Sequence, residues 1–279
     1  MIGAIAGDII GAPYEFANFK RMDFDIFNQN TSFTDDTVML LANAKWLLDS
    51  QQNSDKYSMS KLEEFMVDLG KNYPGAGYGG MFYRWLFQFE SFVTMDGKRA
   101  TKRMPYNSFG NGSAMRVIPV GWACETMEET LQVAKISAKI THNHIEGIKG
   151  AQATAAAIFL ARTGKSKREI KAFIEQNFEY DLNRDCEHIR PYYKFNETCQ
   201  ETVPEAIIAF IDSFDFESSI RLAVSLGGDS DTLACITGGI AEAFYGIPEN
   251  FKSFVNSFLT DDLKTILEDF YQRFIWKEF

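Results

Sequence analysis

The sequence is poor in the residues that build metal-thiolate sites and disulfide frameworks. Among its 279 residues are four cysteines, scattered singly with no C-x-x-C pair, and only three histidines. This spacing is typical of neither a zinc site nor a disulfide-stapled secreted domain. We therefore expect free thiols and a reducing, cytoplasmic environment.

Long hydrophobic runs and a basic leader are also missing. No segment approaches the roughly 18 uninterrupted apolar residues that a membrane span needs. The stretch from Met1 to Gly11 is apolar, but Asp8 interrupts it and no Lys or Arg precedes it. It is therefore a poor signal peptide, and we expect a cytoplasmic protein with no membrane partner.

Positive charge is in deficit, because 28 Lys and Arg face 38 Asp and Glu, for a formal net charge of −10. Such a chain is not expected to hold duplex nucleic acid through bulk electrostatics, so generic nucleic-acid binding is excluded. A nucleotide ligand is not excluded, because a bound cation can reverse the local sign of the charge.

Apolar residues make up 46% of the sequence, which is enough to form one large hydrophobic core. No repeat or low-complexity linker divides the chain. Residues 1–279 are therefore expected to form a single domain, and we favour a monomer.

Helix signals dominate, and alternating strand patterns are scarce. In a capping box, a Ser or Thr and a Glu three residues later satisfy each other's backbone amides. Four such boxes, each followed by apolar residues three and four apart, predict helix starts at Ser60, Thr126, Ser166 and Thr202. The prediction is an all-α fold, a compact bundle of many helices, with residues 180–201 as an irregular insertion.

Small residues recur at close spacing in several predicted helices. Gly3, Gly7 and Gly11 are four apart, as are Ala234 and Gly238. Small side chains let helix backbones approach closely, so packing is the favoured interpretation of these glycines.

Two similar acidic motifs, Thr34-Asp35-Asp36-Thr37 and Asp229-Ser230-Asp231-Thr232, each precede an apolar helical run. Singly, each is explained as a helix cap, with first-turn carboxylates that stabilise the helix dipole by roughly 0.3–1 kcal/mol. Together they suggest two facing helix starts, whose four carboxylates would repel without a cation. Hard oxygen ligands select Mg²⁺, Mn²⁺ or Ca²⁺, and Glu15 would complete a set for two ions.

Three further segments have the composition of ligand loops. Residues 72–80 are rich in glycine with interleaved aromatics and form either a ligand loop or a flexible turn. Residues 107–116 run from a glycine loop into a predicted helix whose amides can hold a phosphate; Arg116 assists there or lies on the surface. His142 and His144 end another predicted helix, where a histidine stabilised by the helix dipole is the commoner case.

Six of these motifs, in this order and separation, resemble the ADP-ribosylglycohydrolase family, the group that includes the dinitrogenase reductase-activating glycohydrolases. They run through nearly the whole chain, at residues 7–15 (G-D-x-x-G-x-x-x-E), 34–37, 74–80, 110–116, 141–142 and 227–232. The resemblance implies an all-α orthogonal bundle, in agreement with the helix patterns.

The resemblance also implies a centre of two Mg²⁺ ions, for which Mn²⁺ is a possible substitute. The implied metal ligands are Thr34, Asp35, Asp36, Asp229, Asp231 and Thr232, with Glu15 as a mobile ligand. The implied substrate-binding residues are Gly75, Gly77, Tyr78 and Gly79 beside the adenosine, Asn111, Gly112 and Ser113 around the diphosphate, and His142 near the distal ribose. Phe109 is a further implied substrate-binding residue.

The activity that the resemblance implies is hydrolysis of the glycosidic bond between ADP-ribose and a modified protein side chain, with arginine favoured. The partner would be ADP-ribose or an ADP-ribosylated protein. Glu15, Asp36 and Asp229 are the catalytic candidates, and either aspartate is a possible base. Two alternatives stay open: a hydrolase of a small ADP-ribosyl or ribosyl metabolite, and a non-catalytic ADP-ribose-binding or structural relative. The complete set of acidic ligands favours an active hydrolase.

Overall fold

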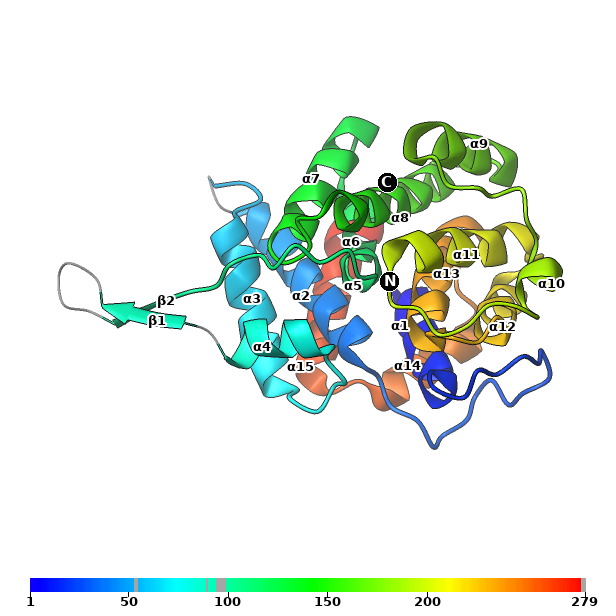
Figure 1. Ribbon diagram of the computed structural model, residues 1–279, viewed down its shortest axis with the longest axis horizontal. Coiled ribbons are helices and arrows are strands. Elements are labelled where there is room, and N and C mark those ends of the chain that lie inside the picture. The colour runs from blue at the N-terminus through cyan, green and yellow to red at the C-terminus, as the bar shows by residue number, and fades with distance from the viewer. Residues whose placement is uncertain (53–54, 89, 94–98, 277–279) are drawn as a thin grey trace.

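The fold is all-α, as the sequence predicts, with one small β-hairpin among the described residues (Figure 1). The computed structural model describes residues 1–52, 55–88, 90–93 and 99–276. Its elements, in chain order, are α1 (Ile2–Gly11), η1 (Ala12–Tyr14), α2 (Asp35–Ser50), α3 (Met59–Asn72), α4 (Gly80–Phe87), β1 (Glu90–Val93), β2 (Arg99–Lys102), α5 (Gly112–Met115), α6 (Ile118–Ala123), α7 (Met127–Lys139), α8 (Ile145–Arg162), α9 (Lys167–Phe178), α10 (Cys186–Ile189), α11 (Cys199–Asp212), α12 (Phe216–Ser225), α13 (Ser230–Tyr245), α14 (Glu249–Phe258), α15 (Asp261–Phe270) and η2 (Tyr271–Ile275).

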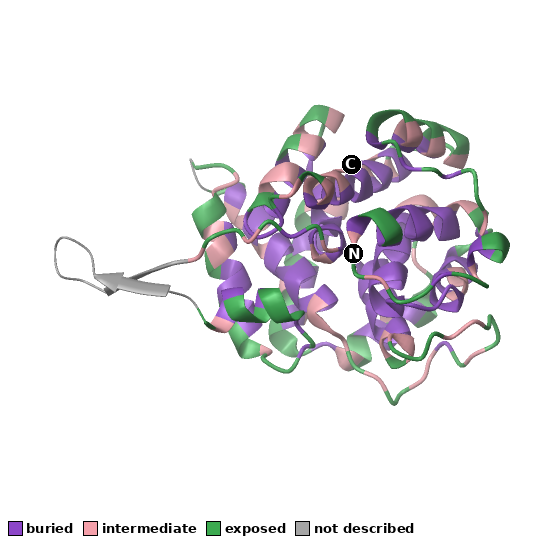
Figure 2. Cartoon of the chain, viewed as in Figure 1, coloured by how far each residue is buried: buried purple, intermediate pink, exposed green. Residues whose placement is uncertain are grey.

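The centre of the molecule is the packed pair α1 and α13. Every residue of α1 is buried, and so is α13 from Ser230 to Glu242, which Figure 2 shows as purple ribbon in the interior. A Cβ atom on Gly7 would overlap the backbone of Ala234, and one on Gly238 would overlap the backbone of Gly3. The predicted packing role of these small residues is confirmed, because their absent side chains let the two backbones touch.

Other helices surround this pair. Helices α11, α12 and α8 contact α13, while α14 contacts α1; α2 packs against α3, α6 and α15. The β1–β2 hairpin is antiparallel and extends away from the helices beside α4 (Figure 1). Among the described residues, no helix combines the length and the apolar character required to cross a membrane.

Side-chain caps explain several of the helix starts. Ser166 and Glu169 form the predicted capping box at α9. At α7, Thr126 is the predicted cap and accepts from the Glu129 amide at 3.1 Å, although the Glu129 carboxylate turns to the amide of Glu125 instead. Loss of a side-chain acceptor for a backbone N–H at a helix start destabilises the helix by about 1 kcal/mol. These hydrogen bonds therefore determine where the two helices begin.

Two predicted starts are wrong by one or more residues. Helix α3 begins at Met59, before Ser60, because the carbonyl of Ser58 already accepts from the amide of Leu62 and from the indole of Trp46. Long-range contacts therefore decide this start.

Helix α11 begins at Cys199 rather than after Thr202, which leaves Pro204 inside the helix instead of in its first turn. The amide of Cys199 donates to the carbonyl of Phe109 at 2.9 Å. The Thr202 hydroxyl is used elsewhere, since it donates to the carbonyl of Asn196 at 3.1 Å. The irregular insertion predicted at residues 180–201 is thus interrupted by α10 and by the start of α11.

Candidate metal centre and ligand cleft

The two acidic motifs meet at one cleft of about 390 Å³. Its floor is formed where the N-termini of α2 and α13 come together beside the end of η1. The hydroxyl of Thr232 lies 3.2 Å from a carboxylate oxygen of Asp36, which joins motifs nearly two hundred residues apart. Six carboxylates line the cleft: Glu15, Asp35, Asp36, Glu197, Asp229 and Asp231.

A buried aspartate on α1 positions the start of α2. The Asp8 carboxylate accepts from the amide and the hydroxyl of Thr34, at 3.0 and 2.7 Å. It also accepts from the amide and the hydroxyl of Thr37, at 3.1 and 2.5 Å. Because α1 packs along α13, the hydrogen bonds of Asp8 hold the start of α2, with its carboxylates, in a fixed position relative to the α1–α13 pair.

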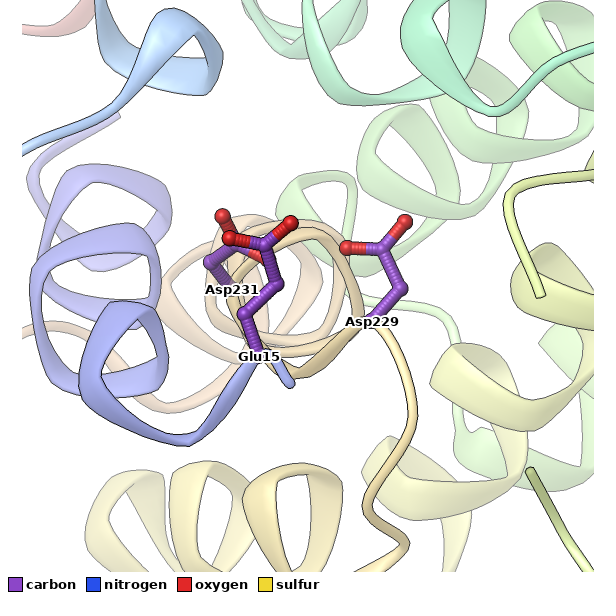
Figure 3. A group of neighbouring side chains, drawn as sticks. All are labelled: Glu15, Asp229 and Asp231. Carbon is purple, nitrogen blue, oxygen red and sulfur yellow. The ribbon is translucent and has the colours of Figure 1, made fainter. Parts of the chain in front are cut away.

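The carboxylates at the centre of the cleft are close enough to share a cation. One oxygen from each of Glu15, Asp229 and Asp231 lies within 4.8 Å of the others. Figure 3 shows the Glu15 and Asp231 carboxylates side by side, with Asp229 facing them from the start of α13. Such spacing is expected of oxygen ligands around a hard divalent ion.

Burial and mutual repulsion raise the pKa values of these acids. Burial first, and then the charge of Asp231, hold the pKa values of Asp35 and Asp36 well above the usual range. Burial raises the pKa of Glu15 to about 8, with Asp231 adding to the effect. The same cause raises that of Asp229 to about 6. The cluster therefore resists carrying its full negative charge unless protons or cations neutralise it.

One further observation indicates that the residues of the cleft fit a divalent cation. One oxygen of the Asp36 carboxylate, Oδ1, is buried and has no hydrogen-bond partner among the described residues. A buried acceptor without a partner costs about 1–3 kcal/mol. A cation would supply this missing partner, and an all-oxygen donor set favours Mg²⁺ or Mn²⁺ over zinc.

Asn111 links the acidic cluster to the rest of the cleft. Its side-chain nitrogen donates to Asp229 at 2.6 Å and to the Thr202 hydroxyl at 3.1 Å. Its backbone amide donates to the carbonyl of Glu197 at 2.7 Å. Asn111 therefore fixes both a core acid and the segment at the end of residues 180–201.

The structure brings most of the sequence-predicted residues to this cleft. Those that line it are Glu15, Asp35, Asp36, Gly77, Gly79, Asn111, Gly112, His142, Asp229, Asp231 and Thr232. Gly77 has a φ of +91°, so the loop before α4 uses a conformation that suits glycine.

Five predicted residues lie outside the lining of the cleft: Thr34, Gly75, Tyr78, Phe109 and Ser113. The Thr34 hydroxyl faces Asp8, and the Tyr78 hydroxyl donates to the carbonyl of Gly70 at 3.3 Å. The Ser113 hydroxyl donates to the carbonyl of Gly147 at 2.7 Å. Phe109 is exposed and its ring contacts that of His144.

Arg116 and the two histidines occupy environments that the sequence does not reveal. Arg116 is buried rather than on the surface. His144 caps the start of α8, where Nδ1 accepts from the amide of Glu146 at 3.1 Å. His142 is buried, and burial together with Arg116 holds its pKa well below the usual range. His142 is therefore not the dipole-stabilised cation that the sequence suggests, and His144 lies at the start of a helix rather than at the end of one.

Sequence reasoning missed two charged residues of the cleft, Arg84 and Glu197. Arg84 lies one turn into α4, directly after the glycine loop, and that spacing is a signal that could have found it. Glu197 lies in the 180–201 segment, and only the tertiary contact between Asn111 and Glu197 brings it to the cleft.

Comparisons with known proteins agree with this architecture. The family model for ADP-ribosylglycohydrolase matches residues 1–278. ADP-ribosylhydrolase ARH3 from Homo sapiens is 27% identical, over 94% of this chain and 90% of that protein. ADP-ribosylarginine hydrolase Tri1 from Pseudomonas putida is 25% identical, over 88% of this chain and 70% of that protein.

A solved structure described as an ADP-ribosylglycohydrolase-related protein complex shares the fold. Its TM-score is 0.72 at 21% identity, over 98% of this chain and 96% of that one. The fold is an all-α bundle, and its cleft gathers a cluster of oxygen donors. The chain belongs to the ADP-ribosylglycohydrolase family.

Proposed function

We propose that this protein hydrolyses the glycosidic bond that joins ADP-ribose to a modified protein side chain, with Mg²⁺ as its cofactor. The observation that carries the proposal is the cluster of buried carboxylates with raised pKa values at the base of the cleft. The family membership and the names of the relatives support ADP-ribosyl hydrolysis as the reaction.

The residues that would hold two Mg²⁺ ions are the acids of the two motifs and Glu15. Asp35, Asp36, Asp229 and Asp231 all line the cleft, and Thr232 adds a hydroxyl. Mn²⁺ would substitute, because it accepts the same oxygen ligands. Bound at this site, the ions would orient the hydroxyls of a sugar and increase the acidity of water.

The chain's own carboxylates would provide the acid–base chemistry. Asp229 is the stronger candidate for the base, because the hydrogen bond from Asn111 at 2.6 Å fixes the orientation of its carboxylate. Asp36 is the second candidate. The developing positive charge on the ribose is stabilised by the surrounding carboxylates.

A further acid of the cleft supports an arginine-linked substrate. Glu197 lines the cleft, and its charge acts on both Glu15 and Asp229. It belongs to neither acidic motif, so its negative charge is free to face the leaving group. A guanidinium group brings a positive charge and N–H donors to such a carboxylate, whereas the glycosidic oxygen of a serine conjugate has neither a charge nor a donor.

The test is a panel of ADP-ribosyl-arginine, ADP-ribosyl-serine, ADP-ribosyl-ester and ADP-ribosylated nucleic acid, each with and without Mg²⁺. We expect Mg²⁺-dependent release of free ADP-ribose from the arginine conjugate, followed by mass spectrometry. Glu197→Gln should lower the preference for arginine over serine while leaving Mg²⁺ dependence unchanged. If no conjugate is cleaved, the substrate assignment fails; cleavage of small ribosyl metabolites alone would support the alternative hydrolase.

A further inference from the structure

Three polar side chains form a continuous chain from the protein interior to the wall of the cleft. Arg116 is buried between α5 and α6, where its Nη2 donates to the carbonyl of Ser137 at 2.9 Å. The same nitrogen donates to the hydroxyl of Thr141 at 2.8 Å. The Thr141 Oγ1 in turn lies 2.7 Å from Nδ1 of His142, which lines the cleft.

The chemistry of Arg116 helps to determine which atoms donate and which accept in this series of hydrogen bonds. A guanidinium group has only donors and stays protonated in proteins. The Thr141 oxygen must therefore accept from Arg116, and its own hydrogen is available for the contact with His142. When the hydroxyl donates, Nδ1 of the ring is the acceptor, and the proton of the neutral imidazole lies on Nε2.

The ring is neutral for reasons that are independent of this bond. His142 is buried, and the nearby positive charge of Arg116 adds to the effect of burial, so that its pKa lies well below the ordinary value. A neutral imidazole has one donor and one acceptor nitrogen. When Thr141 donates to Nδ1, the single proton of the neutral ring is left for Nε2.

Nε2 lies at the glycine loop of the cleft. It is 3.3 Å from the position that a Cβ atom would take on Gly112, and 3.5 Å from the corresponding position on Gly110. The absence of side chains at these glycines leaves room beside the nitrogen. The ring of Tyr106 packs nearby, with its centroid 5.9 Å from that of His142.

We propose that Arg116 and Thr141 fix His142 as the Nε2–H tautomer, so that the ring donates a hydrogen bond to an oxygen of the ligand in the cleft. His142 is then a binding residue and neither a base nor a cation. Thr141 is a positioning residue, which acts on the ligand only through the ring, and Arg116, which itself lines the cleft, positions Thr141. The identity of the ligand rests on the proposed function, whereas the tautomer does not.

The tautomer is tested directly by nuclear magnetic resonance of the ¹⁵N-labelled, ligand-free protein. The chain has only three histidines, so the ring signals are few, and His142→Gln assigns the one that disappears. We expect His142 in the wild-type protein to be almost entirely Nε2–H. A ring protonated on Nδ1, or an even mixture, would overturn the proposal.

Two variants of Thr141 test its positioning role. Thr141→Ser keeps the hydroxyl and should retain the wild-type tautomer, whereas the nearly isosteric Thr141→Val should give a mixture of the two forms. Thermal unfolding of both variants checks that the fold is kept. If the His142 spectrum of Thr141→Val matches that of the wild type, then Thr141 does not fix the ring.

The donor role is tested with ADP-ribose as the probe, by calorimetry in saturating Mg²⁺. His142→Gln retains an N–H donor near the position of Nε2, and its affinity should stay within about threefold of the wild type. His142→Leu removes the donor and should bind about tenfold more weakly. Equal losses in both variants would overturn the donor role. Should the wild-type protein itself not bind ADP-ribose, the proposed function fails, while the ligand-free spectrum still decides the tautomer.

Discussion

The two ends of the cleft are built on opposite principles. At the acidic end, Asp36 and Asp231 are buried with like charges around them, and one oxygen of Asp36 has no partner among the described residues. At the other end, Asn111 and His142 are also buried, but each has a hydrogen-bond partner within 3 Å. At the acidic end a buried carboxylate oxygen has no partner in the described part of the chain, whereas at the second, hydrogen-bonded end the side chains of Asn111 and His142 are held by neighbouring residues.

This difference indicates what each end does. Buried like charges oppose folding unless something neutralises them, and the proposed Mg²⁺ ions would neutralise those of the acidic end. A satisfied polar network is rigid and presents its remaining donors in fixed directions. We therefore expect the second end to bind the proposed ligand with little rearrangement.

The largest expected effect comes from neutralising the acidic end. Asp36→Asn or Asp231→Asn should lower the rate of ADP-ribose release by more than about 100-fold, because losing a group that merely orients a metal ligand already costs 10–100-fold. The metal-free variants should nevertheless unfold at a higher temperature than the wild type, since a repelled charge has been removed. Asp269→Asn, at an exposed site, is the matched control. Full activity in both cleft variants at saturating Mg²⁺ would contradict the metal site.

Filling the acidic end with a cation should have the next largest effect. At a concentration 100 times its dissociation constant, Mg²⁺ should increase the free energy of unfolding by about 2.7 kcal/mol. Thermal unfolding monitored by circular dichroism measures this as a rise in Tm. In Asp231→Asn the rise should shrink or vanish. An equal rise in that variant would place the bound Mg²⁺ elsewhere in the molecule.

The scaffold beneath the acidic end should be less tolerant than the loop over the cleft. A methyl group on Gly7 would overlap the backbone of Ala234, whereas nothing lies within 4 Å of the corresponding position on Gly75. Gly7→Ala should therefore cost about 1–3 kcal/mol of stability, and Gly75→Ala should stay within about 0.5 kcal/mol of the wild type. Denaturant unfolding measures both. Similar stabilities in the two variants would show that α1 and α13 can move apart to accommodate a methyl group, which contradicts this prediction.

The smallest effect should appear at the hydrogen-bonded end of the cleft, where His142 should make the free energy of unfolding depend on pH. Burial and Arg116 lower the pKa of His142 in the folded protein below its unfolded value. The unfolded chain therefore binds the extra proton first, and stability is lost as the pH falls from about 6.5 towards the folded pKa. His142→Gln should remove this part of the pH dependence, whereas His188→Gln, at an exposed site, should keep it. Identical pH profiles for the wild type and His142→Gln would contradict a buried neutral ring.

Local patterns in the sequence predict much of the fold. The helix start at Ser166 is readable because its cap uses residues only three apart. The starts near Ser60 and Thr202 are not readable, because Trp46 and Phe109 decide them from far along the chain. A helix start that depends on neighbouring residues can be predicted from the local sequence. A start that depends on a tertiary hydrogen bond cannot.

The same limit applies to the candidate site. The paired motifs at Asp35 and Asp229 are visible because each is a compact run of acids at a helix start. Glu197 reaches the cleft through a backbone contact with Asn111, and no local pattern marks such a contact. Burial of Arg116 likewise depends on how α5, α7 and α8 pack, so its sequence context allowed a surface position equally well.

The most direct test of this account is a calorimetric titration of the metal-free protein with Mg²⁺, to count the ions bound at the acidic end. We expect two ions for each wild-type chain, and a loss of at least one of them in Asp231→Asn. A wild-type protein that binds no Mg²⁺, or an Asp231→Asn variant that binds both ions as the wild type does, would contradict the account.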